Sequence, residues 1–220
     1  GQCCFNPGEA KSTYGTGCFL LLNTGDKRIS SENRLLSTIA YRLDGKTTYG
    51  LEGSIFVAGS AIQWLRDELN FFESAKDTEE IINHRNVKSK VLVVPAFTGL
   101  GAPHWDPDSR GSIFGLTRNS SIADLTAATL ESIAFQTKDL IGAMENDGAN
   151  FSELRVDGGM VANNWFSQQL ANILNIDVLR PKVIETTALG ASYLASIKAG
   201  LCPNIESLNS RWVSEKTFCT

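Results

Sequence analysis

The chain has 220 residues, which is enough for one large domain or two small ones. Hydrophobic residues make up 42% of it and charged residues 20%, as in an ordinary globular protein, and the formal net charge of -4 without a long block of one sign argues against nucleic acid as the main partner. No apolar run approaches the roughly 18 residues that span a bilayer, and no signal-peptide pattern opens the sequence.

The cysteines do not form a recognisable ligand or disulfide pattern. They are Cys3, Cys4, Cys18, Cys202 and Cys219, an odd number at scattered positions. No C-x-x-C pair occurs, and no histidine lies at ligand spacing from a cysteine. We therefore expect free thiols in a reducing cytoplasm rather than a disulfide framework or a zinc site.

The first 53 residues are predicted to be β-structure. In "KSTYGTGCFLLLNTG" (residues 11–25) a strand leads into a glycine turn at residues 15–17, and an apolar strand then runs to a second turn at residues 24–26. Residues 35–43 and 47–53 are two further strand candidates around a "DGK" turn. Three or four antiparallel strands should therefore come first.

The hydrophobic period changes after residue 53. Apolar residues recur at every third or fourth position in residues 54–72, which predicts an amphipathic helix. Gly59 lies inside this helix, where glycine costs roughly 1 kcal/mol relative to alanine, so we expect something bulky to approach closely there. Residues 73–90 are charged and polar, which favours a short helix and a loop.

The middle of the chain is predicted to add two strands and a long helix. Residues 91–103 are typical of a buried strand that runs into a glycine-rich loop, the following "HWDPDSRG" has turn chemistry, and residues 112–117 are a strand candidate. Ser121 followed by Asp124 is a helix start signal. The helix that begins there should run to about Glu145.

A strand–turn–helix unit is expected after Gly148. "ELRVDGGMVANNWFSQQLANIL" predicts a strand, a Gly-Gly turn and a helix, and residues 177–181 predict another strand. Residues 185–200 predict a final helix with a threonine N-cap and with Gly200 as its stop. This order of elements, without an internal repeat, favours one α/β domain over the whole chain.

Two glycine turns have the chemistry to bind phosphate. At residues 15–17, backbone N–H groups and the Thr16 hydroxyl can converge on an anion, although no lysine follows as it would in a P-loop. At the second turn Asp157 closes a strand, and Gly158 and Gly159 let a ligand approach a helix start with free N–H groups and a positive dipole end. A glycine hairpin and a plain βα turn are the non-functional alternatives.

No residue spacing selects a catalytic acid–base pair or a triad. The carboxylates that could be combined on paper are Asp106, Asp108, Glu131, Asp157 and Glu185. His84 and His104 lie in polar and turn stretches, and no serine lies in a G-x-S-x-G elbow, so a hydrolase is disfavoured. The single segments therefore predict an α/β domain with two turns suited to phosphate.

Taken together, six segments resemble the C-terminal half of the glycerol kinases, a branch of the FGGY carbohydrate kinases. In chain order they are "TYGTGCFLLLNTG", "LEGSIFVAGSAIQWLRDEL", "PAFTGLGAPHWDPDSRG", "GSIFGLTRNSSIADLTAATLESIAFQT", "RVDGGMVANN" and "ETTALGASYLA". They cover nearly all of residues 1–205. The resemblance implies the ribonuclease-H-like fold of actin and hexokinase, an α/β domain whose mixed sheet has antiparallel N-terminal strands and is flanked by helices.

The resemblance also implies roles for individual residues. Those that match nucleotide-binding positions of the family are Gly15, Thr16, Gly59, Gln63, Gly159 and Asn163. Of these, Thr16 would place its hydroxyl near the terminal phosphate of ATP, and Phe19 would pack on the glycerol carbons. Mg²⁺ would arrive with ATP, bound largely through phosphates and water.

The chain departs from the family pattern at both ends. The family's catalytic base is an Asp in a G-D-Q motif that would lie before Gly1, and the N-terminal domain with most glycerol contacts and the last C-terminal helices have no counterpart here. We therefore expect residues 1–220 to be a C-terminal FGGY nucleotide-binding domain that carries no catalytic residue and is inactive alone.

The parent enzyme implied by the resemblance would transfer the γ-phosphate of ATP to glycerol, giving glycerol 3-phosphate and ADP. It would be a cytoplasmic homo-oligomer whose partners are ATP or ADP, glycerol and the N-terminal domain. The alternatives are a domain of another FGGY sugar or polyol kinase and a non-catalytic ATP-binding or oligomerisation module.

Overall fold

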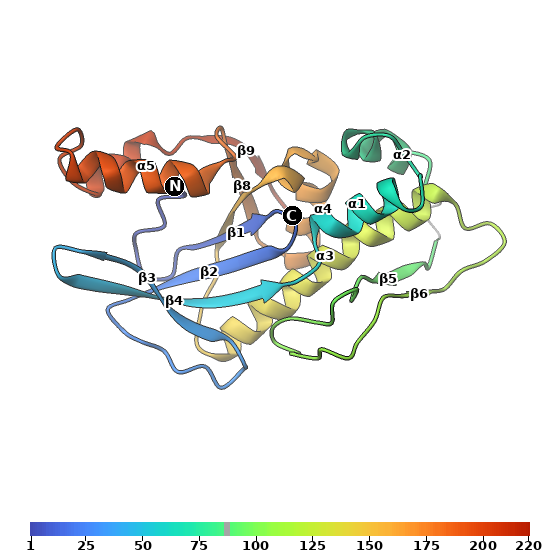
Figure 1. Cartoon of the computed structure of the whole chain (residues 1–220), viewed down its shortest axis with the longest axis horizontal. Helices are drawn as coiled ribbons and strands as arrows, with labels where there is room; N and C mark the ends of the chain where they lie inside the picture. Colours follow the sequence, from blue (N-terminus) through green and yellow to red (C-terminus); the bar gives the residue numbers. More distant parts are fainter. Residues whose placement is uncertain (86–88) are drawn as a thin grey trace.

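The computed structural model describes residues 1–85 and 89–220, and a seven-stranded mixed sheet runs through it in the order β3-β4-β2-β1-β7-β8-β9 (Figure 1). The strands are β1 (Ala10–Tyr14), β2 (Cys18–Gly25), β3 (Leu36–Leu43), β4 (Lys46–Ile55), β7 (Glu153–Asp157), β8 (Asp177–Pro181) and β9 (Ser214–Phe218). Alternating strands and helices make this the mixed α/β sheet that the sequence predicts.

Strand β1 lies where the sheet changes from antiparallel to parallel. The predicted N-terminal antiparallel block is confirmed, because β1 pairs with β2, β2 with β4, and β4 with β3, all antiparallel. On its other side β1 pairs parallel with β7, with Thr13 opposite Asp157 at the carboxyl ends of both strands. The two glycine turns that follow β1 and β7 therefore come out at the same edge of the sheet.

Five α-helices and three short 3-10 turns surround this sheet in the described part of the chain. The helices are α1 (Gly59–Asp67), α2 (Thr78–Ile82), α3 (Ile122–Asn146), α4 (Asn164–Leu174) and α5 (Thr186–Lys198), and the turns are η1 (Ala75–Asp77), η2 (Gly159–Ala162) and η3 (Glu206–Arg211). The long helix α3 contacts β4, α1, α2 and α4, so it forms the centre of one layer against the sheet.

The predicted start of α3 is confirmed in detail. The Ser121 side chain accepts a hydrogen bond from the Asp124 amide, and the Asp124 carboxylate accepts one from the Ser121 amide. This capping box satisfies two N–H groups that a helix start leaves without intrahelical partners. The helix ends at Asn146, one residue beyond the position expected from the sequence.

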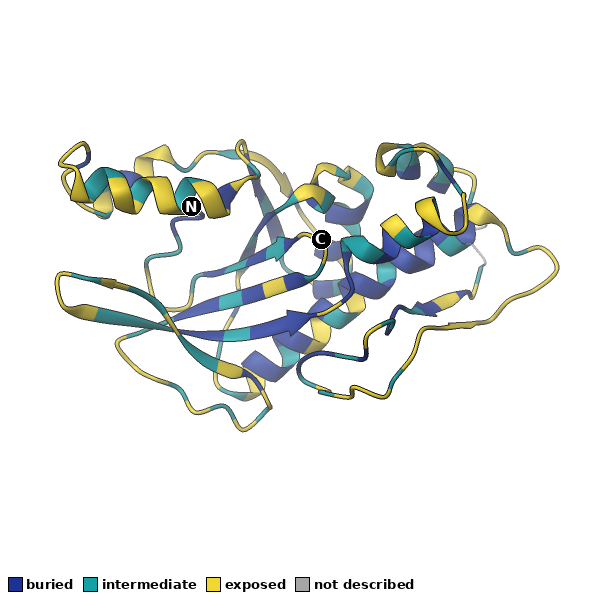
Figure 2. Ribbon diagram, viewed as in Figure 1, coloured by how far each residue is buried: buried dark blue, intermediate teal, exposed yellow. Residues whose placement is uncertain are grey.

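The main core lies between the sheet and the α3–α4 layer (Figure 2). Tyr14 is fully buried there, with its ring edge-to-face against Phe166 at 5.2 Å and its hydroxyl 3.1 Å from the Thr137 hydroxyl. Burial raises the pKa of Tyr14 well above its ordinary value, so the phenol stays protonated. The side chain of Tyr14, the last residue of β1, is thus fixed in the core between the sheet and helices α3 and α4.

Helix α5 and the N-terminal segment share a separate, smaller core. Cys3, Cys202 and Leu208 are buried together, and Tyr193 and Ile197 of α5 pack against them. Only Thr186 is buried among the residues of α5, and the N-terminus of the chain lies beside this helix (Figure 1). The apolar cluster at this end of the molecule is therefore separate from the main core, although Gln2 is hydrogen-bonded to Asp157 of β7.

A second, two-stranded sheet packs on the first half of α3. It consists of β5 (Leu92–Val94) and β6 (Ser112–Phe114), paired antiparallel. Val91 and Val93 are buried against Ala128 of α3. All three residues of β6 are exposed, so this strand covers nothing with its own side chains.

Two expectations about secondary structure were wrong, and one strand was missed. The helix expected over residues 54–72 begins only at Gly59, because Ser54 and Ile55 still pair with β2 as the end of β4. The N-cap of α5 is Glu185 without a capping hydrogen bond, not a threonine. Strand β9 was not foreseen, although Gly200 ends α5 with φ +73° as expected.

The cysteines lie in different parts of the structure, three of them buried. All five thiols are free, and burial raises the pKa of Cys18 to about 12, which makes it an unreactive core residue. Among the described residues, no group of three or more His, Cys, Asp or Glu side chains is placed to hold a metal ion. No helix in the same part of the chain is long and apolar enough to cross a membrane.

Candidate functional site

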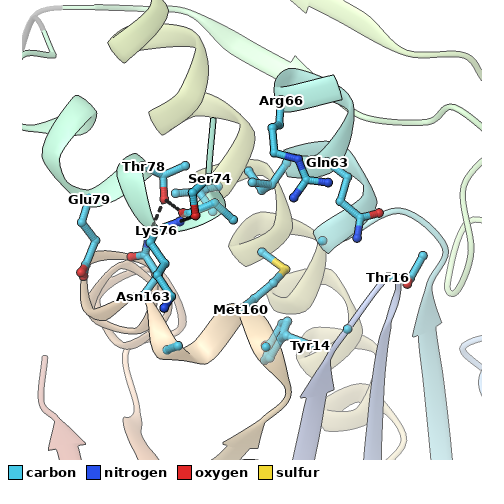
Figure 3. Close-up of a pocket in the computed structure, with 17 residues that line it drawn as sticks. Tyr14, Thr16, Gln63, Arg66, Ser74, Lys76, Thr78, Glu79, Met160 and Asn163 are labelled. Carbon is cyan, nitrogen blue, oxygen red and sulfur yellow. Dashed lines mark hydrogen bonds between the residues drawn. The ribbon is translucent and has the colours of Figure 1, made fainter. Parts of the chain in front are cut away.

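A cavity of about 690 Å³ opens at the edge of the sheet where β1 and β7 end, a size typical of small-molecule sites. Its walls come from the β1–β2 turn, α1, the segment from Ser74 to Glu79, and the turn after β7 (Figure 3). All six residues assigned to nucleotide binding from the sequence border it: Gly15, Thr16, Gly59, Gln63, Gly159 and Asn163. Residues that are up to 148 positions apart in the chain thus meet around one space.

The β1–β2 turn is tied to the start of α1 through its carbonyl groups. The carbonyls of Gly15 and Thr16 accept hydrogen bonds from the first amides of α1, namely Gly59 N at 2.9 Å, and Ala58 N and Ser60 N at 2.9 and 3.1 Å. Among the hydrogen bonds of the described residues, none uses the amide of Thr16 or Gly17, or the exposed Thr16 hydroxyl. The turn therefore offers donors without partners, backed by the positive end of α1.

The same contact explains why a glycine starts α1. A Cβ on Gly59 would lie 2.5 Å from the Gly15 carbonyl oxygen, too close for any side chain. The close approach that the sequence required at this position is thus made by the protein's own backbone. Gly59 and Gln63 lie one turn apart on the cavity side of α1.

The two glycines after β7 have different surroundings: Gly158 lies against the backbone of Tyr14, and Gly159 borders open space. Gly158 has φ +93°, and a Cβ there would lie 2.4 Å from the Tyr14 carbonyl oxygen, so it lets the two turns pass one another. Gly159 has no atom within 4 Å of the position that its Cβ would take. The empty space beside Gly159 belongs to the cavity, so a ligand can reach its backbone directly.

The positive end of α4 is not available to a phosphate, which corrects one expectation from the sequence. The Glu79 carboxylate from α2 accepts hydrogen bonds from the first two amides of α4, Asn164 N at 2.5 Å and Trp165 N at 3.0 Å. A protein carboxylate thus occupies the place where an anionic ligand was expected to bind. The β1–β2 turn, whose Thr16 and Gly17 amides take part in none of the hydrogen bonds found among the described residues, is thus the better placed of the two turns for a phosphate.

Side-chain contacts attach the segment from Ser74 to Arg85 to α4 and α3, and we call this segment the outer wall. Asn163 donates to the Thr78 hydroxyl at 2.9 Å and caps α4 by accepting from the Phe166 amide at 2.8 Å. Arg85 lies over the Trp165 ring at 5.6 Å and pairs with Glu131 at 2.7 Å. Asn163 is therefore part of this attachment and retains one side-chain N–H for a ligand.

Sequence reasoning missed the other residues that border the cavity, among them Arg66, Ser74, Lys76 and Met160. Figure 3 shows Gln63 and Arg66 on one side, Ser74 and Asn163 on the other, and Met160 between them. Lys76 lies in a charged stretch without a recognisable motif, and Arg66 does not belong to a motif either, so neither had a sequence signal of its own. In the structure Arg66 donates to the carboxylate of its neighbour Asp67.

Phe19, assigned to glycerol from the sequence, is not among the residues that border the cavity. It lies on β2 opposite Thr13 and Ser54, and half of its surface is exposed. It follows Gly17, the last residue of the β1–β2 turn, by two residues and lies on the exposed side of the same hairpin, since its neighbours Cys18 and Leu20 are buried. Its role in substrate binding stays a prediction.

Three of the five carboxylates considered for an acid–base pair in the sequence have structural partners instead of one another. Asp157 is buried and accepts from the Gln2 amide at 2.7 Å, and Glu131 pairs with Arg85. The Ser109 hydroxyl, followed by two backbone amides, lowers the pKa of Asp106, as is typical of a turn former. These groups therefore do not form an acid–base pair.

Comparison with known proteins decides the family. The model of the C-terminal domain of the FGGY family of carbohydrate kinases matches residues 10–199. The chain belongs to this family. The FGGY chain is 58% identical to a glycerol kinase of Marinomonas sp. (strain MWYL1) over 218 residues, and 55% identical to a glycerol kinase of Rhizobium meliloti (strain 1021) over 221 residues. Each match covers 99% of this chain but 44% of the relative, so the chain spans less than half the length of these proteins.

Solved structures agree on the fold. The glycerol kinase of Plasmodium falciparum, determined with ADP, superposes with a TM-score of 0.90 at 38% identity, and the match covers all of the FGGY chain and 44% of that protein. A xylulose kinase of Lactobacillus acidophilus superposes with a TM-score of 0.83 at 22% identity, which shows the fold alone. The ribonuclease-H-like fold expected from the sequence is thereby confirmed.

A pair of glycine substitutions tests the contact between α1 and the β1–β2 turn. Gly59→Ala should lower the free energy of unfolding by about 1–3 kcal/mol, because the new methyl group must displace the backbone of the turn. Gly142→Ala, in α3 where nothing lies within 4 Å of the new Cβ, should instead raise it by up to about 1 kcal/mol. Urea titration followed by circular dichroism measures both, and equal effects would contradict the assigned contact.

Removing the Glu79 carboxylate tests the attachment of the outer wall. Glu79→Ala should cost about 1–2 kcal/mol of stability because the first amides of α4 lose their acceptor. Glu80→Ala is the matched control, since Glu80 is the next residue of α2 and is exposed. Hydrogen exchange should show faster exchange of the Asn164 and Trp165 amides only in the Glu79 variant.

Proposed function

We propose that this chain is the nucleotide-binding domain of an ATP-dependent glycerol kinase. The observation that carries the proposal is the convergence of the two glycine turns, at Thr16 and at Gly159, on one cavity. Its relatives support the choice of reaction, because glycerol kinases match it at 53–58% identity. The Plasmodium falciparum glycerol kinase that has the same fold was determined with ADP.

In this proposal the triphosphate lies on the β1–β2 turn. The amides of Thr16 and Gly17 and the Thr16 hydroxyl donate to phosphate oxygens, and the positive end of α1 adds to the attraction. These donors are fixed before the ligand arrives, because the turn is tied to α1 through the carbonyls of Gly15 and Thr16. Fixed donors of this kind stabilise the charge that shifts during phosphoryl transfer.

The adenosine part then extends between α1 and the outer wall. Gln63 lies along it on one side, and Gly159 and Asn163 lie on the other. Met160 supplies an apolar surface, and the space beside Gly159 lets the nucleotide contact the backbone. The outer wall completes the enclosure of the base.

Mg²⁺ would be held mainly by the nucleotide. The donor groups that face the cavity in the described residues are amides, hydroxyls and two cationic side chains, with Glu79 already bound to α4. This set suits phosphate oxygens rather than a bare cation, so the ion would arrive with ATP and keep water ligands. When bound, it would neutralise charge on the transferred phosphoryl group.

The rest of the catalytic machinery is assigned to the part of the parent enzyme that the relatives have and this chain does not. In the parent, an Asp of the G-D-Q motif would take the proton of the glycerol hydroxyl, and closure of the two domains would exclude water. Phe19 would cover the glycerol carbons at the mouth of that cleft. The parent would be a homo-oligomer in a reducing compartment such as the cytoplasm.

Titration with a fluorescent ATP analogue tests the nucleotide site. Thr16→Val and Gly159→Val should each weaken binding by roughly tenfold or more, because one removes a donor to a charged group and the other fills the space that the ligand needs. Thr187→Val, at an exposed site on α5, is the control and should bind the analogue as tightly as the unsubstituted 220-residue chain does. Unchanged affinity in both site variants, with folding verified by circular dichroism, would show that the site is misplaced.

A coupled enzyme assay tests whether the group that takes the glycerol proton lies outside these 220 residues. The purified chain should release no ADP in the presence of ATP, Mg²⁺ and glycerol, because the group that takes the glycerol proton is absent. A longer parent that includes the G-D-Q segment should be active under the same conditions, and Thr16→Val in that parent should lower kcat. Glycerol-dependent turnover by the 220 residues alone would refute this assignment.

A further inference from the structure

A buried arginine lies near the carboxyl end of β8, behind the turn that follows β7. The Arg180 side chain is 8% exposed, and its guanidinium lies 5.4 Å from the centre of the Phe218 ring. A charged group inside a protein is costly unless hydrogen bonds and opposite charges compensate it. The partners of Arg180 therefore indicate which parts of the molecule it holds in place.

The guanidinium of Arg180 contacts three separate segments at once. Its Nη1 donates to the Val161 carbonyl in η2 at 2.7 Å, and its Nη2 donates to Oδ1 of Asn164 at the start of α4 at 3.2 Å. Its Nε donates to the Glu215 carboxylate of β9 at 2.9 Å. The planar fork of five N–H groups can serve such divergent acceptors, whereas a single ammonium group cannot. Arg180 thus joins η2 and α4 to the sheet.

The turn that Arg180 contacts is one wall of the cavity assigned to the nucleotide. Gly159, Met160 and Ala162 of η2 border this cavity, whereas Val161 between them is fully buried in the main core (Figure 3). Arg180 is not among the described residues that line this cavity. It therefore acts on the wall from behind, without access to a ligand.

Packing alone does not fix this wall, because a second cavity lies behind it. That cavity has a volume of about 410 Å³, and Arg180 and Glu215 are among its lining residues. Ala162 borders both cavities, so open space lies on either side of η2 at this residue. The position of the wall therefore depends on the hydrogen bonds to the Val161 carbonyl, from Arg180 and from the Ser167 hydroxyl at 3.2 Å.

Stability alone does not explain an arginine at this position. A buried ion pair is often no more stabilising than well-packed apolar side chains of the same volume, because both charges must leave water. The Glu215 side chain is half exposed, which weakens its attraction to Arg180 further. An apolar side chain could fill the same space, but it could not supply N–H groups aimed at Val161 and Asn164.

We propose that Arg180 is a positioning residue of the nucleotide site, which holds η2 where it faces the adenosine part of ATP. The inference rests on the proposed function, since that function assigns Gly159 and Asn163 to the adenosine. The phosphates lie on the other turn, which is tied to α1 through the carbonyls of Gly15 and Thr16. Arg180 should therefore influence one half of the site and not the other.

The affinity for a fluorescent ATP analogue tests this role. Arg180→Met should raise the Kd by about tenfold, because η2 loses its contact with β8. Arg180→Lys keeps the charge but not the fork, so it should also raise the Kd several-fold, and it serves as the test if Arg180→Met does not fold. Glu215→Gln is the control, because its amide oxygen can still accept from Nε and the contacts to η2 remain. Its Kd should stay within about twofold of that of the unsubstituted chain.

Double variants identify the half of the site on which Arg180 acts. Arg180→Met combined with Gly159→Val should bind the analogue nearly as weakly as Gly159→Val alone, because both changes disturb η2. Combined with Thr16→Val, the two fold-changes in Kd should multiply, because Thr16 lies in the separate phosphate turn. A general loss of folding would affect both combinations alike, and urea titration followed by circular dichroism measures it directly.

Two results would overturn the role of Arg180 while leaving the nucleotide site in place. One is an unchanged Kd in both Arg180 variants. The other is a fold-change that multiplies with that of Gly159→Val as fully as with that of Thr16→Val. An unsubstituted chain that does not bind the analogue would instead refute the proposed function, and the role of Arg180 with it.

Discussion

The parallel pairing of β1 with β7 is the constraint on which the candidate site depends. These strands are about 140 residues apart in the chain, yet Thr13 lies opposite Asp157. This register places the ends of both strands at one edge, and the glycine turns that follow can touch because Gly158 has no side chain next to the Tyr14 carbonyl. Tyr14 in turn is anchored by Phe166 and Thr137, so the packing of the core fixes the geometry of the turns.

Local patterns were sufficient where short-range chemistry decides the structure. The capping box of α3, the hairpin around residues 15–17 and the Gly-Gly turn after β7 all depend on residues within a few positions of one another. The end of β4 and the start of α1 could not be separated in this way. The apolar residues from Ile55 to Val57 satisfy a helical period, but pairing with Cys18 of β2 keeps Ile55 in the strand.

The parts of the site that involve distant residues were beyond pattern reasoning. Nothing in the charged stretch around Glu79 indicates that its carboxylate would reach the amides of α4, more than 80 positions away. The sequence therefore predicted a helix start open to phosphate where the fold has already filled it. Resemblance to a family supplied the six residues around the cavity, and elementary chemistry explains four of them through the turns and α1.

The outer wall differs from the other walls of the cavity in how it is held. The β1–β2 turn, α1 and the turn after β7 are joined by backbone hydrogen bonds and by close contacts at glycine, so most substitutions there would disturb the sheet itself. The segment around Ser74 and Lys76 is attached through side chains, by the polar contacts of Thr78, Glu79 and Arg85 and by the packing of Ile82 in the core. Protein engineers who wish to change which nucleobase such a domain accepts could therefore randomise Ser74, Ala75 and Lys76. The β1–β2 turn and the sheet would stay as they are.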